Sequence, residues 1–303
     1  MVELEKEKNM KRVIVTGAGG CIGSHVVRGL AGQYDVTPLF HEYIPEGATK
    51  GSSLDITDAA AVVKFIDNVK PDAVVNLAAI ADPDTCEKNK ELAKLVNVQG
   101  AENIAKACAN TGVYLIHYST DLVFDGQKGM YTEEDPVNPL NLYAKTKADS
   151  EKVVLSANPL TAVLRTAIVY GKGSGKRQNF SEYAIAQIRN GKGLKLFTDQ
   201  YRSFLYVEDE TSAISALIES SVTGIYHACG GERKSRYDFT VDIMRRLDLP
   251  TDKIEGISMD DIKGHAPRPK DCSLDNSKIK RDTGWRPSSF DKAMPRFKLS
   301  LSL

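Results

Sequence analysis

The stretch RVIVTGAGGCIGSHVV, residues 12–27, joins a short β-branched run to a glycine-rich turn and the start of a helical pattern. Gly17, Gly20 and Gly23 have G-x-x-G-x-x-G spacing directly after the expected strand. Glycine lets the backbone turn tightly and approach a pyrophosphate, and a helix N-terminus supplies free N–H groups. Between a strand and a helix, this spacing predicts a dinucleotide-binding loop in preference to a plain structural turn.

Short β-branched runs alternate with longer helical patterns through the first two-thirds of the chain. The expected strands are residues 12–17, 35–40, 72–78, 113–119 and 161–171. The expected helices are residues 21–31, 58–69, 87–110 and 142–156. This alternation, with nearly continuous Val, Ile and Leu strands, is typical of a parallel sheet covered on both faces. The sequence therefore predicts an α/β protein with a Rossmann-type, doubly wound parallel sheet, which binds ligands at the carboxyl ends of its strands.

The alternation changes after residue 171, where a Gly/Lys-rich loop begins, and charged residues, Pro and short elements dominate from residue 229 onward. We therefore expect two units. The first, residues 10–172 plus 203–228, is the dinucleotide-binding Rossmann domain. The second, residues 173–202 plus 229–303, is a smaller C-terminal α/β lobe that binds substrate over the carboxyl edge of the sheet.

The composition favours a protein that acts on small molecules. The 303 residues include 40 basic and 40 acidic side chains, whereas binding to nucleic acid or a membrane surface would favour a basic excess. Five scattered cysteines without C-x-x-C spacing predict reduced thiols in a cytoplasmic protein, with no metal site. The charged N-terminus is not a secretory signal, and residues 1–9 are expected to be a loose extension. No apolar run approaches the roughly 20 residues that span a bilayer.

Several residues after the glycine loop are candidates for the cofactor site. Asp55 is placed to accept a hydrogen bond from the adenine amino group, or else it caps a helix, a role that Thr57 or Asp58 fills more naturally. Ala78 and Ala79, after the third strand, leave room for a cofactor or allow tight packing between sheet and helix. After the second strand, His41 would meet the 2′-phosphate of NADP, and Glu42 would meet the ribose hydroxyl of NAD. We expect NADP(H) in preference to NAD(H).

Tyr143 and Lys147 are four residues apart, so they share one face of the expected helix. One interpretation is an ordinary surface pair worth only tenths of a kcal/mol. The other is a catalytic acid whose pKa the nearby ammonium lowers from the usual value of about 10. Thr120 comes from a strand that ends at the same sheet edge and would orient a substrate oxygen. Carbonyl reduction needs these parts together, which favours the catalytic interpretation.

The motifs VTGAGGCIGS, STDLVFDG, Y-x-x-x-K, FLYVEDE and RPKDCSLD together resemble those of the extended short-chain dehydrogenase/reductases, over residues 10–297. Residues 119–151 look most like the dTDP-4-dehydrorhamnose reductase branch. The resemblance implies a nicotinamide cofactor, a nucleotide-sugar substrate and catalytic roles for Thr120, Tyr143 and Lys147. It also implies a homodimer, because the helices near 87–110 and 142–156 pair in many relatives.

The expected site follows from the motifs and the resemblance together. Asn97 would support the catalytic lysine through water, and Arg268 would hold the pyrophosphate of the nucleotide sugar. The expected cofactor site comprises Gly17, Gly20, Cys21, Ile22, Gly23, His41, Asp55, Ile56, Ala78, Ala79, Asn97, Ser119, Tyr143 and Lys147. The expected substrate site comprises Asp121, Ile168, Arg202 and Arg268.

Two departures from the family pattern affect the expected function. Leu122 replaces both the glutamate of sugar-nucleotide dehydratases, which argues against dehydration, and the tyrosine common in the reductases. Ile168 stands where the reductases commonly have a tryptophan. We expect an NAD(P)H-dependent reductase of a nucleotide-linked 4-keto-6-deoxy sugar that forms dTDP-L-rhamnose. The alternatives are a nucleotide-sugar epimerase that retains NAD, and a non-catalytic regulatory subunit similar to the methionine adenosyltransferase β-subunit.

Overall fold

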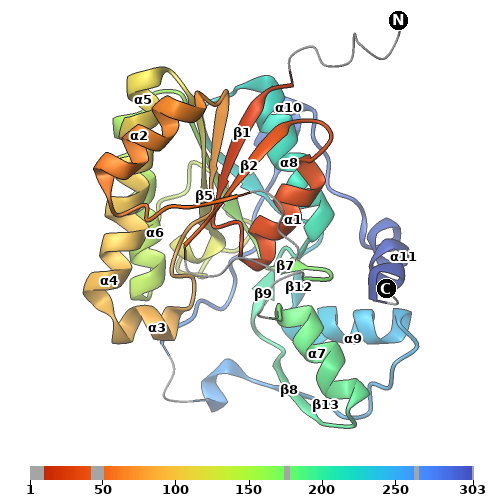
Figure 1. Cartoon of the computed structure of the whole chain (residues 1–303). Helices are drawn as coiled ribbons and strands as arrows, with labels where there is room; N and C mark the ends of the chain where they lie inside the picture. Colours follow the sequence, from red (N-terminus) through yellow and green to blue (C-terminus); the bar gives the residue numbers. More distant parts are fainter. Residues whose placement is uncertain (1–9, 42–50, 174–177, 263–265, 302–303) are drawn as a thin grey trace, which may run out of the picture.

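The computed structural model describes residues 10–41, 51–173, 178–262 and 266–301. In this part of the chain the central sheet has seven strands in the order β11-β6-β5-β4-β1-β2-β3, and all its pairs are parallel (Figure 1). Its strands are β1 (Arg12–Thr16), β2 (Asp35–Phe40), β3 (Ser52–Ser53), β4 (Ala73–Asn76), β5 (Tyr114–Thr120), β6 (Thr161–Thr166) and β11 (Gly224–Ala228). The strand order changes direction at β1, which confirms the predicted doubly wound α/β class.

Helices cover both faces of this sheet (Figure 1). One face packs against α1 (Cys21–Leu30), α8 (Val207–Ser220) and α10 (Ser277–Thr283), and the other against α2 (Ala59–Val69), α5 (Ala101–Thr111) and α6 (Leu142–Ala157). Along β1, Val13 and Val15 pack in the core on the α1 face of the sheet, and Ile14 packs in the core on the α2 face. Successive side chains of a strand point to opposite faces, so a strand buried on both faces is apolar throughout.

Side-chain caps fix where two of these helices begin. Asp58 Oδ1 accepts hydrogen bonds from the backbone N–H groups of Ala60 and Ala61 at the start of α2, both at 3.0 Å. Asn141 Oδ1 accepts from Ala144 N at 2.9 Å at the start of α6. Such caps satisfy N–H groups that have no partner within the helix. The Asn141 cap places Tyr143 and Lys147 in the first two turns of α6.

Two expected elements differ from those observed. In place of one helix at 87–110, the structure has α3 (Pro83–Lys88), α4 (Lys90–Lys94), a π-helix (Leu95–Gly100) and α5. Asn89 separates α3 from α4 because its φ of −125° is not helical. The expected strand at 161–171 ends at Thr166, and residues 169–170 pair with β10 (Leu205–Tyr206) instead. The chain thus leaves the sheet at its carboxyl edge.

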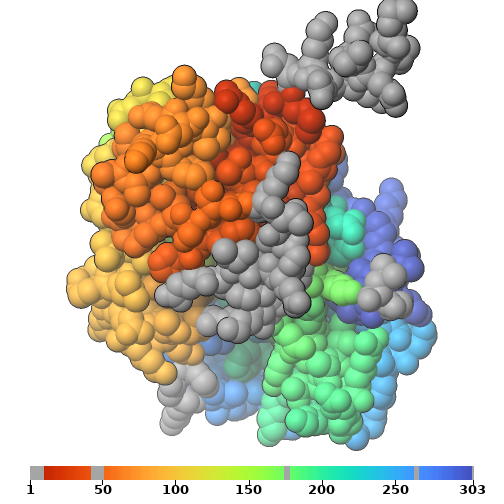
Figure 2. Space-filling model, in the orientation of Figure 1, coloured from red at the N-terminus to blue at the C-terminus, as the bar shows by residue number. Residues whose placement is uncertain are grey.

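A separate hydrophobic core, the second core, lies beyond that edge, away from the two faces of the sheet, in the lower part of Figures 1 and 2. There Phe204 and Phe239 stack with their ring centroids 3.7 Å apart. The further elements are β7 (Val169–Tyr170), α7 (Phe180–Arg189), β8 (Leu194–Phe197), β9 (Tyr201–Arg202), β12 (Lys234–Ser235), α9 (Arg236–Arg246), β13 (Ile254–Ile257), α11 (Phe290–Leu301) and 3₁₀ turns at Asp121–Val123 and Met259–Asp261. The short strands pair as β7–β10, β9–β12 and β8–β13. None of the helices in the described ranges is both long and apolar enough to cross a membrane.

Candidate active site

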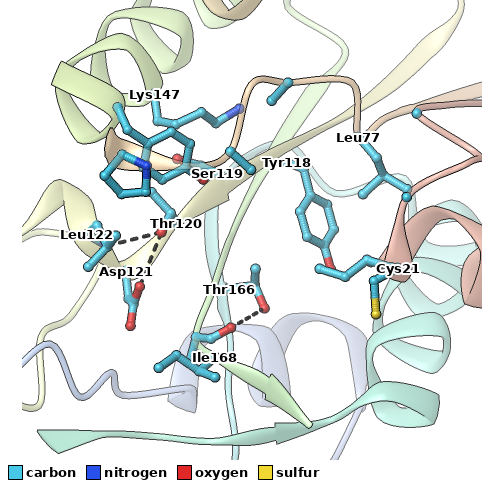
Figure 3. A pocket seen from close by; sticks show the side chains of 18 of the residues that line it. Cys21, Leu77, Tyr118, Ser119, Thr120, Asp121, Leu122, Lys147, Thr166 and Ile168 are labelled. Atoms are coloured by element: carbon cyan, nitrogen blue, oxygen red, sulfur yellow. Dashed lines mark hydrogen bonds between the residues drawn. The ribbon is translucent and has the colours of Figure 1, made fainter. Parts of the chain in front are cut away.

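A cavity of about 600 Å³ opens at the carboxyl ends of β1, β4, β5 and β6. Most of the predicted site residues line it: Gly17, Gly20, Cys21, Ile22, Gly23, Ala78, Ala79, Ser119, Thr120, Asp121, Tyr143, Lys147, Ile168, Arg202 and Arg268. Figure 3 shows Thr120 and Lys147 on one side of this cavity, and Tyr118 reaching toward Cys21 on the other. Folding therefore brings residues from the glycine loop, three strand ends and the second core around one space.

The glycine loop forms a tight cradle between β1 and α1. Gly17 has a φ of +64°, which favours glycine, and a Cβ at Gly23 would lie 2.2 Å from Gly17 O. Gly20 precedes α1 and has no side chain that could cap the first N–H groups of the helix. This end of the helix offers amide donors and a partial positive charge to an anion. The loop therefore fits the pyrophosphate of a dinucleotide.

Four predicted cofactor residues do not line the cavity. Asp55 is exposed, and its Oδ1 accepts from the backbone N and hydroxyl of Thr57 at 2.9 and 2.8 Å, which lowers the pKa of Asp55. Ile56 is buried. His41 is exposed just after β2. Glu42 and residues 1–9 lie outside the described residues.

Asn97, the fourth of these residues, is buried in the π-helix. It forms hydrogen bonds with the segment after β4 and with α6. Its side chain accepts from Ile80 N at 2.8 Å and donates to Ile80 O at 3.1 Å. It also donates to the hydroxyl of Thr146, one residue before Lys147, at 3.0 Å. Its expected support of Lys147 through water stays a prediction.

Thr120 and Asp121 close the end of β5. Thr120 Oγ1 donates to Asp121 Oδ1 and accepts from Leu122 N, both at 3.2 Å (Figure 3). Asp121 Oδ2 lies 3.1 Å from Arg202 Nε, although the angles there are not those of a hydrogen bond. Burial raises the pKa of Asp121, and the charge of Arg202 opposes that rise.

Tyr143 differs from the sequence prediction. Its pKa is raised, not lowered, because burial and the nearby Asp121 carboxylate disfavour the phenolate more than a hydrogen bond with Thr120 favours it. Lys147 has no part in this shift. The prediction failed because it counted the lysine four residues away and could not count desolvation. In this structure Tyr143 is a neutral phenol at pH 7.

Lys147 is buried, with 3% of its surface exposed. Burial lowers its pKa to about 8, and Glu151 on the same helix opposes the shift. Glu151 itself pairs with Arg165 Nη2 at 2.7 Å and accepts from the hydroxyl of Ser119. Ser119 therefore lines the cavity with its hydroxyl already engaged.

Several residues of the cavity wall were missed by the sequence analysis, among them Gln200 and Arg236. The side-chain nitrogen and oxygen of Gln200 are both buried and have no hydrogen-bond partner. The same is true of the Nε atoms of Arg202, Arg236 and Arg268. Burial and the charges of the other two arginines lower the pKa of Arg236. Buried polar atoms are normally satisfied, so this group of four side chains is suited to an anionic ligand rich in oxygen acceptors. No local pattern marks Gln200 or Arg236, which join the cavity only through the tertiary fold.

The comparisons with known proteins agree with this architecture. Residues 10–301 match the family model for the RmlD substrate binding domain. The chain belongs to this family. Membership confirms the predicted resemblance to extended short-chain dehydrogenase/reductases of the dTDP-4-dehydrorhamnose reductase branch.

The chain is similar to relatives that carry two different kinds of name. The dTDP-4-dehydrorhamnose reductase of Aggregatibacter actinomycetemcomitans is 31% identical over 94% of this chain and 97% of its own. Methionine adenosyltransferase 2 subunit beta of Xenopus tropicalis is 34% identical over 89% of this chain and 82% of its own. The crystal structure of dTDP-4-dehydrorhamnose reductase from Bacillus anthracis in complex with NADP superposes with a TM-score of 0.87, at 27% identity, over 96% of this chain and 99% of that one. The chain is thus a homologue of both a reductase and a synthetase subunit.

Proposed function

We propose that this protein is an NAD(P)-dependent oxidoreductase that reduces a nucleotide-linked 4-keto-6-deoxy sugar, as a dTDP-4-dehydrorhamnose reductase forming dTDP-L-rhamnose. One observation carries the proposal. A single cavity contains the dinucleotide cradle, the set Thr120, Tyr143 and Lys147, and the arginine group. Reduction of a keto sugar on a nucleotide needs all three. The reductase relatives support this assignment.

The chemistry divides between the chain and the cofactor. Bound in the cradle, a reduced nicotinamide would supply a hydride for the carbonyl carbon. Tyr143 donates its phenolic proton to the carbonyl oxygen, and its raised pKa keeps the phenol protonated at neutral pH until the carbonyl accepts that proton. The Thr120 hydroxyl orients the same oxygen. Lys147, as the second member of the Tyr-x-x-x-Lys pair, holds the nicotinamide ribose.

The second core and the arginine group would serve the nucleotide sugar. We assign residues 173–202 and 229–303 to a substrate lobe, because their apolar side chains dominate the second core beside the cavity. Arg202, Arg236 and Arg268 would bind the diphosphate, whose oxygens can satisfy the orphaned guanidinium nitrogens. Arg268 is partly held by Asp84, 3.7 Å away. The cavity wall at Leu122 and Ile168 would face the sugar.

Two finer assignments belong to the same proposal. NADP(H) is preferred to NAD(H), because the exposed imidazole of His41 lies just after β2, where the 2′-phosphate of NADP is recognised in Rossmann folds. The protein is a homodimer, because Leu92 and Leu95, in the expected pairing region, are 51% and 45% exposed.

A second function is favoured by a specific observation. The chain is 34% identical to a protein named methionine adenosyltransferase 2 subunit beta, and it has Leu122 and Ile168 where reductases commonly have aromatic residues. This second function is that of a non-catalytic regulatory subunit, which would bind the cofactor without turnover. An epimerase that retains NAD would instead change the sugar without consuming added cofactor.

One assay separates these functions. The purified chain is incubated with dTDP-4-dehydrorhamnose and either NADPH or NADH, and both cofactor oxidation and the sugar product are quantified. Equal amounts of oxidised cofactor and reduced sugar support the reductase. A changed sugar without cofactor oxidation indicates the epimerase. Tight cofactor binding without any sugar product would contradict the reductase and favour the regulatory subunit.

A further inference from the structure

Four buried polar side chains form a hydrogen-bonded chain beneath the cavity, next to Lys147. Thr16 on β1, Asn76 on β4 and His117 on β5 lie opposite one another in the parallel register. Ser150 on α6 completes the chain, Lys147 lies one turn before it on the same helix, and all five residues are at most 3% exposed. Because buried polar groups are costly unless paired, the direction of each hydrogen bond here is constrained by its neighbours.

The direction of the chain begins at Thr16. Its Oγ1 accepts from the backbone N–H groups of Leu77 and Ala78, both at 3.2 Å. The hydroxyl proton is therefore left to donate to Asn76 Oδ1, 2.7 Å away. With its oxygen used in this way, Asn76 turns its Nδ2 donor toward His117 Nδ1 at 3.2 Å. Reversing the amide would leave the Thr16 proton without an acceptor.

This order fixes the tautomer of His117. Since Nδ1 accepts from Asn76, the ring proton is on Nε2. Nε2–H donates to Ser150 Oγ at 2.9 Å, and the Ser150 hydroxyl donates to Lys147 O at 2.7 Å. Every member of the chain then has a partner with the correct polarity.

Lys147 Nζ lies 3.4 Å from the same Nε2 atom. A protonated Nε2 has no lone pair for the ammonium, so His117 fills the space behind Lys147 without accepting a hydrogen bond from it. The other ionisable group that acts on the Lys147 ammonium is Glu151 on α6, and Glu151 is committed to Arg165 of β6. The donors of Lys147 are left to face the cavity.

We propose that His117 is a positioning residue that keeps the ammonium of Lys147 free of any partner behind it and directs Nζ to the cofactor side of the cavity. This deepens the proposed function, since it assumes that Lys147 acts in that cavity. It also predicts that the basicity of Lys147 is set by the orientation of the Thr16–Asn76–His117 chain. The lowered pKa of Lys147, about 8, and the strongly lowered pKa of His117, both caused mainly by burial, accord with this arrangement.

Two substitutions should move the pKa of Lys147 in opposite directions. In His117→Gln an amide oxygen can accept from the ammonium, so the pKa of Lys147 should rise by about one unit or more toward its ordinary value of about 10.4. In Ser150→Ala the Nε2–H loses its acceptor and can donate only to a neutral Lys147 amine, so the pKa should fall. A merely structural role would not produce shifts of opposite sign.

The measurement is an NMR titration of the ligand-free protein labelled at the lysine side chains, with Lys147 assigned by comparison with Lys147→Arg. His227→Gln is the matched control, because His227 is another buried histidine, but it lies near Arg165 instead of Lys147. It should leave the Lys147 pKa unchanged. An unchanged Lys147 pKa in either His117→Gln or Ser150→Ala, or shifts of the same sign in the two variants, would overturn the proposal.

The titration does not depend on turnover. The proposed function can therefore fail in the sugar assay while the role of His117 stands, or the reverse. If His117→Gln does not fold, the Ser150→Ala titration alone decides, since a raised or unchanged pKa there contradicts the proposal.

Discussion

Asp121 Oδ2 lies 3.1 Å from Arg202 Nε, with only 4% and 2% of the two side chains exposed. Removing one partner of a buried ion pair leaves the other charge uncompensated. We predict that Arg202→Met lowers the free energy of unfolding by about 3–5 kcal/mol in denaturant titrations. The control is Lys106→Ala, which breaks a pair with Glu102 at a 59% exposed lysine and should cost below about 1 kcal/mol. Similar losses in the two variants would contradict the importance of the buried pair.

In the glycine loop, we expect Gly23 to be needed for folding and Gly20 for binding of the cofactor. Gly23→Ala places a Cβ 2.2 Å from a backbone oxygen, so it should destabilise the fold by about 1–3 kcal/mol.

At Gly20 the nearest atom to a Cβ is 3.3 Å away, so Gly20→Val should leave the protein folded. Its branched side chain would occupy the space of the pyrophosphate and weaken cofactor binding at least ~10-fold, about 1.4 kcal/mol. Thermal unfolding and fluorescence titration of NADPH measure the two effects, and unchanged NADPH affinity in Gly20→Val would refute the placement of the cofactor.

The buried His227 makes stability depend on pH. Burial, and next the charge of Arg165, lower its pKa to about 3, whereas the unfolded chain binds that proton near pH 6.5. The unfolded state therefore binds more protons between these values, and stability falls as the pH drops through this window. Relative to His227→Gln, the wild type should lose about 1.4 kcal/mol per pH unit below pH 6. Parallel stability curves for the two proteins would show that His227 is not kept neutral by the fold.

Cofactor preference is tested at His41. This side chain is exposed, so its interaction with a 2′-phosphate would contribute at most about 1 kcal/mol. His41→Ala should weaken NADPH binding about two- to five-fold and leave NADH binding unchanged. Dissociation constants for both cofactors give the ratio, and an unaltered ratio would argue against His41 as the source of selectivity.

The sequence predicted five of the seven strands described in the sheet because their signal is local, and it missed the two edge strands, β3 and β11. The runs around Val13–Val15 and Val74–Val75 are buried on both faces, which requires apolar residues at consecutive positions. The glycine spacing and the Tyr143–Lys147 pair are local signals too, and both line the cavity. The π-helix at Leu95–Gly100 was missed, because it depends on the tertiary contacts of Asn97 with Ile80 and Thr146.

The rest of the site could not be derived from local patterns. Gln200 and Arg236 were not predicted, because they are distant in the chain and join the predicted Arg202 and Arg268 only in the folded protein. The tautomer of His117 depends on three strands and one helix. The direction of the Tyr143 pKa shift was wrong in the sequence analysis, because burial is a property of the whole fold.

The most direct test of the proposed mechanism is the steady-state rate of NADPH oxidation with dTDP-4-dehydrorhamnose in Tyr143→Phe and the wild type, with cofactor affinity measured alongside. The substitution removes only the phenolic hydroxyl and keeps the ring. We predict that cofactor affinity stays the same and turnover falls by ~10²–10⁴-fold, the usual contribution of a general acid. Wild-type turnover in Tyr143→Phe would contradict the assignment of Tyr143 as the proton donor.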